Sequence, residues 1–174
     1  MEKIDTRAWK DFLIGDLFEV SRPITRSQAH YEEGDVPFVA SGNTNNGVVK
    51  WCKPQVDDIL DMKGCISVSP LDGTAFYQPV NFLGRGGAGS AILLLYNDQL
   101  TEMSGLFIAT VLRAGLTKFS YNDQINSQTI LIQTIKLPVT SEGQPDFSYM
   151  ETYMKTIIQE SEKCLKRLCQ ALPL

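Results

Sequence analysis

The run Ala91-Ile-Leu-Leu-Leu-Tyr96 is the longest uninterrupted apolar stretch in this sequence of 174 residues. An apolar run without polar alternation is typical of a strand that is buried on both faces of a sheet. The run is far too short to cross a bilayer as a helix, which needs about 20 apolar residues. We therefore expect it to be a central strand of a mixed α+β domain.

Other short strand-like segments lie on both sides of this run in the sequence. The segments Val36–Ala40 and Gly47–Trp51 flank an Asn46-Gly47 turn, which predicts a hairpin. The N-terminal stretch Trp9–Val20 is expected to form a short strand and a turn of helix that dock onto the domain. The remaining predicted strands are Cys65–Ser69, Thr74–Gln78 and Thr129–Leu137.

Two segments have the periodicity of amphipathic helices. The first is Met103–Arg113, where Met103, Leu106, Phe107, Thr110 and Val111 form one stripe and Gly115 ends the helix. The second begins at Ser148-Tyr-Met-Glu151, which fits a capping box, and runs to about Ala171. Its heptad seam consists of Met150, Met154, Ile157, Ser161, Cys164 and Leu168.

These patterns predict a compact, β-rich α+β domain at residues 1–147. Residues 148–174 then form a projecting, coiled-coil-like helix. The composition, with 43% hydrophobic and 21% charged residues, is ordinary for a globular protein. The polar N-terminus lacks the apolar region of a secretory signal, so we expect a cytoplasmic protein.

The sequence offers little support for catalysis or for a bound cofactor. Its single histidine, His30, lies in a polar loop, and its four cysteines have spacings that fit reduced thiols in or near the core better than a zinc site. The glycine-rich stretch Gly84–Ser90 lacks the lysine of a phosphate-binding loop. The acidic cluster Asp57, Asp58 and Asp61 matches no calcium loop and is expected to be a solvated face.

Several polar loops, in contrast, carry side chains suited to reading DNA bases. Arg, Lys, Asn and Gln donate and accept hydrogen bonds in the patterns that base edges present. Each such residue alone is more simply an ordinary solvated loop residue, and only their distribution over several loops favours DNA recognition. The candidates are Arg22, Arg26, Gln28, Asn43, Asn45, Asn46, Lys50, Arg85, Lys118, Tyr121, Asn122, Gln124 and Asn126.

The formal net charge of −4 opposes this interpretation, because contacts to phosphates dominate the affinity of most DNA-binding proteins. The local field on one face matters more than the total charge. We therefore expect weak DNA binding by the isolated chain, with a basic partner supplying much of the phosphate contact.

Five motifs, in order along the chain, resemble those of target-recognition domains in type I restriction–modification specificity subunits. The opening Phe12-Leu-Ile-Gly-Asp-Leu-Phe-Glu-Val20 is similar to the first element of that family. The others are Val36-Pro-Phe-Val-Ala-Ser41 with Asn45-Asn-Gly47, then Gly73-Thr-Ala-Phe-Tyr-Gln-Pro79, Lys118-Phe-Ser-Tyr121 and Ile135-Lys-Leu-Pro138. The tail Gly143-Gln-Pro-Asp-Phe-Ser-Tyr-Met-Glu151 instead resembles recognition domains of type IIB and IIG systems.

The resemblance implies a non-catalytic specificity subunit that binds double-stranded DNA. In that family two recognition domains each read half of a bipartite site, and long helices separate them and dock the methyltransferase subunits. The partners supply S-adenosylmethionine, adenine methylation and any endonuclease. This chain has one domain and one helix, so two copies are expected to form a homodimer through residues 148–171 and read a two-fold symmetric site.

Two other classes of function remain open at this point. A half subunit of this kind can act as a protein-interaction module that occupies the methyltransferase docking surface and inhibits restriction. The negative net charge of the chain mildly favours that hypothesis. A small-molecule enzyme on an α+β scaffold is the third reading, and it would need a deep pocket that holds titratable groups with perturbed pKa values.

Overall fold

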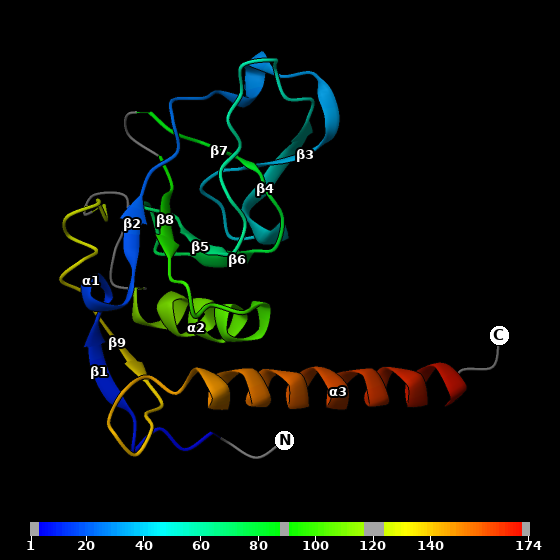
Figure 1. Ribbon diagram of the computed structural model, residues 1–174. Coiled ribbons are helices and arrows are strands. Elements are labelled where there is room, and N and C mark those ends of the chain that lie inside the picture. The colour runs from blue at the N-terminus through cyan, green and yellow to red at the C-terminus, as the bar shows by residue number, and fades with distance from the viewer. Residues whose placement is uncertain (1–3, 88–90, 117–123, 172–174) are drawn as a thin grey trace.

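The computed structural model describes residues 4–87, 91–116 and 124–171 (Figure 1). Strand β8 (Leu93–Tyr96) lies inside a four-stranded antiparallel sheet, between β2 (Glu19–Ser21) and β5 (Cys65–Val68). Strand β6 (Ala75–Gln78) completes the sheet on the other side of β5. The chain is therefore a mixed α+β protein, as predicted.

The apolar run is buried on both faces because it separates two hydrophobic cores. Leu93 and Leu95 point into the larger core, whereas Ile92 and Leu94 belong to a smaller core on the opposite face. Successive side chains of a strand point to opposite faces, so a strand between two cores needs apolar residues at every position. The absence of alternation in the sequence is thus explained by the two-sided burial of β8.

Helix α2 (Glu102–Gly115) covers the sheet on the side of the larger core (Figure 1). A capping box of Thr101 and Ser104 fixes its start. Its buried face is not the predicted stripe, because Ile108 and Leu112 are fully buried whereas Thr110 is exposed. The helix packs against β6, β9 and α3, and these contacts together decide which face is buried.

A smaller lobe lies beside the four-stranded sheet and contains the predicted hairpin. Strands β3 (Glu33–Val39) and β4 (Val48–Cys52) pair antiparallel, and the short β7 (Leu83–Gly84) runs parallel to β3. The turn between β3 and β4 includes the 3-10 helix η2 (Asn45–Gly47), and all three of its residues have positive φ. Asparagine and glycine tolerate this backbone region, which explains the turn signal in the sequence.

The N-terminal segment forms β1 (Lys10–Leu13) and α1 (Ile14–Leu17), which confirms the predicted short strand and turn of helix. Strand β1 pairs antiparallel with β9 (Thr134–Leu137). The predicted strand at 129–137 was too long, because residues 127–132 form turns. The Asn126 side chain accepts hydrogen bonds from the amides of Gln128 and Thr129, which bends the chain at that point.

Helix α3 (Phe147–Ala171) begins on the domain and then leaves it (Figure 1). The predicted capping box of Ser148 and Glu151 is wrong. The Asp146 carboxylate accepts from the amide of Tyr149 at 2.8 Å, and Glu151 instead bonds Thr101 and Lys155. Within the described residues, no helix is both long and apolar enough to cross a membrane.

Only the outer part of α3 projects, because its first turns belong to the domain. Met150 is fully buried in the larger core, and Met154 packs against that core. From Gln159 to Gln170 every side chain is exposed. Met150 was predicted to face a second chain. The structure corrects this, because the domain itself already covers that side chain.

Candidate nucleic-acid interface

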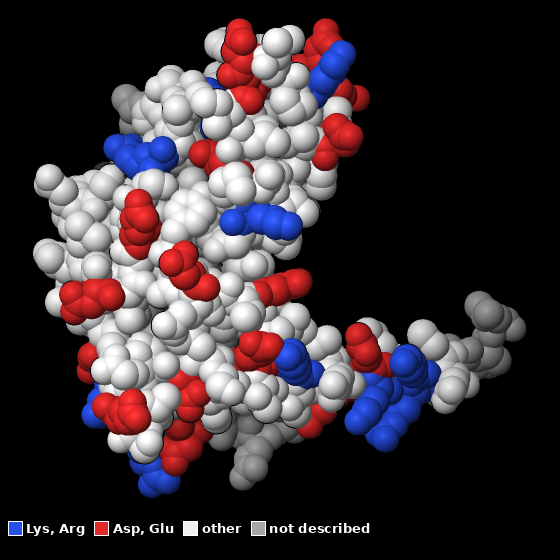
Figure 2. Space-filling view, viewed as in Figure 1, with Lys and Arg blue, Asp and Glu red and all other residues white. Residues whose placement is uncertain are grey.

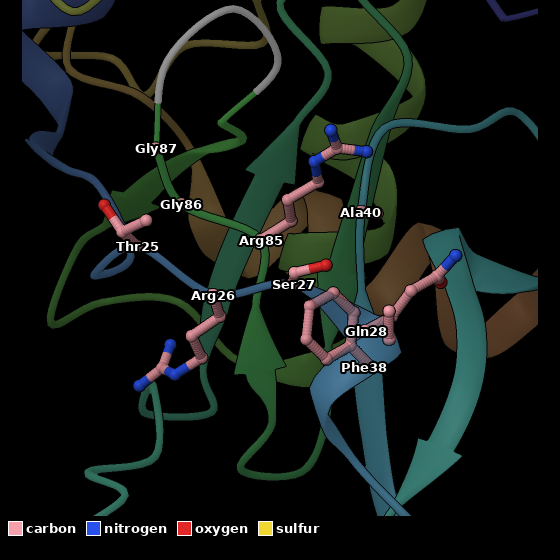
Figure 3. A pocket seen from close by; sticks show the side chains of 10 residues that line it. Thr25, Arg26, Ser27, Gln28, Phe38, Ala40, Arg85, Gly86 and Gly87 are labelled. Carbon is pink, nitrogen blue, oxygen red and sulfur yellow. The ribbon is translucent and has the colours of Figure 1, made fainter.

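The loop before β3 and the bend after β7 meet at a polar pocket of about 340 Å³ (Figure 3). An isolated parallel bridge between Thr25 and Gly86 holds the two segments together. Phe38 and Ala40, on and just after β3, form the apolar floor between them. The lining residues are Thr25, Arg26, Ser27, Gln28, Ala29, Phe38, Ala40, Arg85, Gly86 and Gly87.

Arg26 was expected on a solvated loop, and the structure instead places it inside the protein. Its guanidinium pairs with Asp61 at 2.7 Å and lies 3.8 Å from Asp58. It also donates to the carbonyl oxygens of Gly84 and Ile59. A buried guanidinium is stable only when carboxylates and carbonyl oxygens compensate its charge. We therefore remove Arg26 from the candidate DNA contacts and assign it a structural role.

The acidic cluster Asp57, Asp58 and Asp61 was expected to be a solvated face, and the ion pairs with Arg26 show that this is wrong for Asp58 and Asp61. The side chains of Asp58 and Asp61 are largely buried, and the Tyr31 hydroxyl donates a hydrogen bond of 3.0 Å to the Asp58 carboxylate. Burial, followed by this hydrogen bond to a carboxylate, raises the pKa of Tyr31 above its usual value. Among the described residues, no group of His, Cys, Asp and Glu side chains is placed to hold a metal ion.

Three candidates around the β3–β4 hairpin bond to the protein itself. The Asn46 amide donates to the Tyr77 carbonyl at 3.0 Å, and Gln78 donates back to the Asn46 carbonyl at 3.1 Å. Asn45 donates to the carbonyl of Val48, and the Lys50 ammonium donates to that of Tyr31. The Asn46 bonds hold the hairpin tip against β6, and the Asn45 bond lies within the hairpin, so both asparagines have a structural use.

Arg85, Arg22 and Asn43 are exposed, and no bond engages their side chains within the described part of the chain. Gln124 is half-buried and already has an interaction within the protein. Three further candidates, Lys118, Tyr121 and Asn122, lie outside the described residues. Among the predicted side chains that the structure describes, Arg85, Gln28 and Arg26 come together at the pocket.

Sequence reasoning missed the pocket and the ion pairs of Arg26 beside it. Thr25 and Ser27 gave no signal, because single hydroxyl residues in a loop are common. The acidic cluster at 57–61 was visible in the sequence and could have suggested an ion pair with one of the arginines. No sequence rule decides which arginine pairs with it, because the partners are 35 residues apart.

The charge distribution is uneven over the surface. In Figure 2 acidic side chains are spread over the body of the molecule with several basic ones among them, and a group of basic side chains lies on the outer part of α3. That part of the helix contains Lys163, Lys166 and Arg167. Residues 160–171 also contain Glu160 and Glu162, so three basic and two acidic side chains give this segment a net charge of +1, against −4 for the whole chain.

The predicted seam of α3 divides into a covered and an uncovered part. Met154 and Ile157 are half-buried against the body, whereas Ser161, Cys164 and Leu168 are exposed. Leu165 and Leu168 have 61% and 55% of their surface exposed. Outer α3, residues 160–171, thus carries an apolar stripe that the described part of the chain does not cover.

The chain is similar to known specificity subunits. One relative is the specificity subunit S.BcgI of a type II restriction enzyme from Heyndrickxia coagulans. It is 23% identical over 150 residues, which are 84% of this chain and 42% of the relative. This type II relative is in line with the resemblance of the tail.

Two solved structures have a similar fold. The S subunit of a type I restriction–modification system from M. genitalium has a TM-score of 0.56 and 15% identity, over 95% of this chain and 44% of the other. The HsdS subunit from Thermoanaerobacter tengcongensis has a TM-score of 0.53 and 19% identity, over 95% and 41%. The chain thus spans less than half the length of these relatives.

A family model covers nearly the whole chain. The model of the type I restriction modification DNA specificity domain matches residues 6–167, from the segment before β1 to the exposed part of α3. Its description is of DNA specificity, which agrees with the expectation of a DNA specificity module. The chain belongs to the family of type I restriction modification DNA specificity domains.

Proposed function

We propose that this chain reads one half of a DNA target site for a restriction–modification system and recruits the methyltransferase subunit. Loops at the pocket between residues 25–29 and 85–87 supply the base contacts. Outer α3 binds a second chain. Double-stranded DNA is the ligand, and S-adenosylmethionine is held by the methyltransferase subunit. An endonuclease subunit is a further partner.

The observation that carries the proposal is the uncovered apolar stripe of outer α3. Residues 160–171 span about 18 Å at 1.5 Å per residue. An exposed apolar stripe of Cys164, Leu165 and Leu168 on a projecting helix favours a helical partner that covers it. The family match supports a partner within a restriction–modification complex.

A second copy of the chain is one partner that this stripe fits. Two copies that pair through outer α3 place two recognition domains about a two-fold axis, and such a dimer reads a symmetric site. The basic residues Lys163, Lys166 and Arg167 then need acidic or solvent-exposed neighbours, because like charges that face each other oppose pairing.

The competing function is an interaction module that occupies the methyltransferase docking surface and inhibits the complex. The net charge of −4 and the acidic side chains on the body favour it. The two functions differ in DNA binding by the assembled complex. A recognition module gives a complex whose affinity falls steeply with salt, and an inhibitor gives a complex without specific binding.

The test is co-expression with the methyltransferase subunit encoded nearest to this gene, followed by sequencing of the host DNA for methylated adenine. We expect a new, discrete methylated motif, and a symmetric motif if two copies pair. No methylation from two folded chains that bind each other would contradict recognition and favour inhibition.

A further inference from the structure

We propose that Arg85 reads a guanine in the target site by donating two parallel hydrogen bonds to O6 and N7 on its major-groove edge. This proposal rests on the proposed function, because it assigns a base to one side chain of the candidate interface. Four observations support it: a fixed backbone, a free guanidinium, the neutral polar side chains around it, and the donor pattern of arginine.

The backbone at Arg85 is fixed on both sides. Its amide donates to the Val39 carbonyl at 2.8 Å, and its own carbonyl accepts from the Ile92 amide at 3.1 Å. A Cβ atom at Gly86 would collide with the backbone of Ile24, so the bend after β7 lies directly against the loop before β3. Because this backbone is already held on both sides, only the Arg85 side chain has to become ordered when it binds a ligand.

The guanidinium of Arg85 is available to a ligand. The residue is exposed, and its side chain has no ion pair or hydrogen bond within the described ranges. Figure 3 shows the side chain extending over the pocket, whereas Arg26 points away from it. Because Arg26 is paired with Asp58 and Asp61, Arg85 is the free cation among the ten lining residues.

The side chains around Arg85 offer a base edge both hydrogen-bond donors and hydrogen-bond acceptors. The polar residues Thr25, Ser27 and Gln28 share the pocket with it, and their side chains are neutral. In Figure 3, Gln28 and Arg85 extend to the same side of Phe38. Neutral hydroxyl and amide groups beside a single arginine can read several edges of one base pair or of neighbouring pairs. Arginine and lysine contacts to phosphate, in contrast, fix position without reading sequence.

The donor pattern of arginine suits guanine better than adenine or cytosine. The planar guanidinium has only donors, and guanine presents two adjacent acceptors, O6 and N7, in the major groove. Adenine presents one acceptor beside one donor, which suits Gln28 better than Arg85. Cytosine presents a donor that opposes the guanidinium. Loss of Arg85 should therefore relax the target motif at one guanine.

The experiment compares the methylated motif of the wild-type complex with those of Arg85→Ala and Arg85→Lys. Lysine keeps the charge but loses the planar pair of donors. We expect both variants to accept other bases at one guanine position, with about ten- to hundred-fold less discrimination there and no change elsewhere. Arg7→Ala, an exposed arginine far from the pocket in sequence, is the matched control and should leave the motif unchanged.

Other outcomes overturn the proposal. A phosphate contact would leave the motif intact in Arg85→Lys and weaken methylation evenly at all positions in Arg85→Ala. If the variants methylate nothing, binding of the purified wild-type complex to duplexes with 7-deazaguanine at one position at a time decides. If 7-deazaguanine weakens binding at no position of the duplex, the proposal is overturned. A wild-type complex without any motif would instead refute the proposed function.

Discussion

Burial decides what an arginine does in this protein. Arg26 and Arg7 each lie 2.7 Å from an aspartate oxygen. The Arg26 side chain is 2% exposed and that of Asp61 is 14% exposed, whereas the Arg7 pair is open to solvent. A buried pair leaves an uncompensated charge when one partner is lost, and an exposed pair leaves two solvated groups.

We therefore expect Arg26→Ala to lower the free energy of unfolding by about 3 kcal/mol, because the largely buried Asp58 and Asp61 would lose the guanidinium that compensates them. Urea denaturation followed by circular dichroism measures this loss. Arg7→Ala is the control and should leave the urea midpoint unchanged. Equal midpoints for the two variants would show that the Arg26 pairs contribute nothing.

At the scale of one element, α2 contains two glycines in opposite surroundings. A Cβ atom at Gly105 would collide with the ring of Tyr77 on β6, whereas a Cβ atom at Gly115 meets nothing within 4 Å. Replacing glycine by alanine in a helix normally adds up to about 1 kcal/mol of stability. At Gly105 the close packing of α2 on the sheet should reverse that sign.

We expect Gly105→Ala to destabilise the protein by about 1–3 kcal/mol, because α2 must move away from Tyr77. Gly115→Ala should be neutral or slightly stabilising. Thermal unfolding of both variants checks the contrast. A stabilised Gly105→Ala variant would mean that Tyr77 moves aside without cost.

Helix α3 should respond differently along its length, because only its start is covered. Met150→Ala should cost about 2–5 kcal/mol, since Met150 is fully buried in the larger core. The double variant Leu165→Lys and Leu168→Lys should leave the thermal midpoint of the isolated chain unchanged. It should abolish association through outer α3, because it removes the apolar stripe.

Sedimentation equilibrium over a range of protein concentrations measures this association, together with capture of the co-expressed methyltransferase subunit. Wild-type chain that stays monomeric and still binds that subunit would assign outer α3 to the partner rather than to a second copy. A double variant that keeps both associations would contradict a docking role for the stripe.

At the scale of the whole molecule, the four free thiols differ in exposure between the body and outer α3. Cys52 and Cys65 are buried in the body, whereas Cys164 and Cys169 are exposed on the helix. The sequence predicted reduced thiols in or near the core, and the position of the second pair differs from that expectation. Burial raises the pKa of Cys65 to about 12.

We expect two thiols to react rapidly with an aromatic disulfide reagent at pH 8 and two only after unfolding in urea. At that pH about one in ten thousand Cys65 thiols is ionised, and only the thiolate reacts. Mass spectrometry of the labelled peptides identifies the reactive pair. Slow labelling of Cys164 in the assembled complex, compared with the isolated chain, would show that a partner covers outer α3.

Features that depend on neighbours in the chain were predictable from the sequence. The apolar run at 91–96 specified a two-sided buried strand, and Asn46-Gly47 specified the turn between β3 and β4. The repeat of apolar residues specified α3 as one long helix. Strand and helix periodicities are local properties, because they follow from the direction in which successive side chains point.

Tertiary structure decided the pairings between distant segments. It buried Arg26 against Asp61, 35 residues away, and left Arg85 free over the same pocket, although both arginines had looked alike in the sequence. It also covered Met150 and exposed Leu168 on one helix. The physical reason is that solvation and charge pairing depend on which atoms surround a side chain, and the fold brings those atoms from elsewhere in the chain.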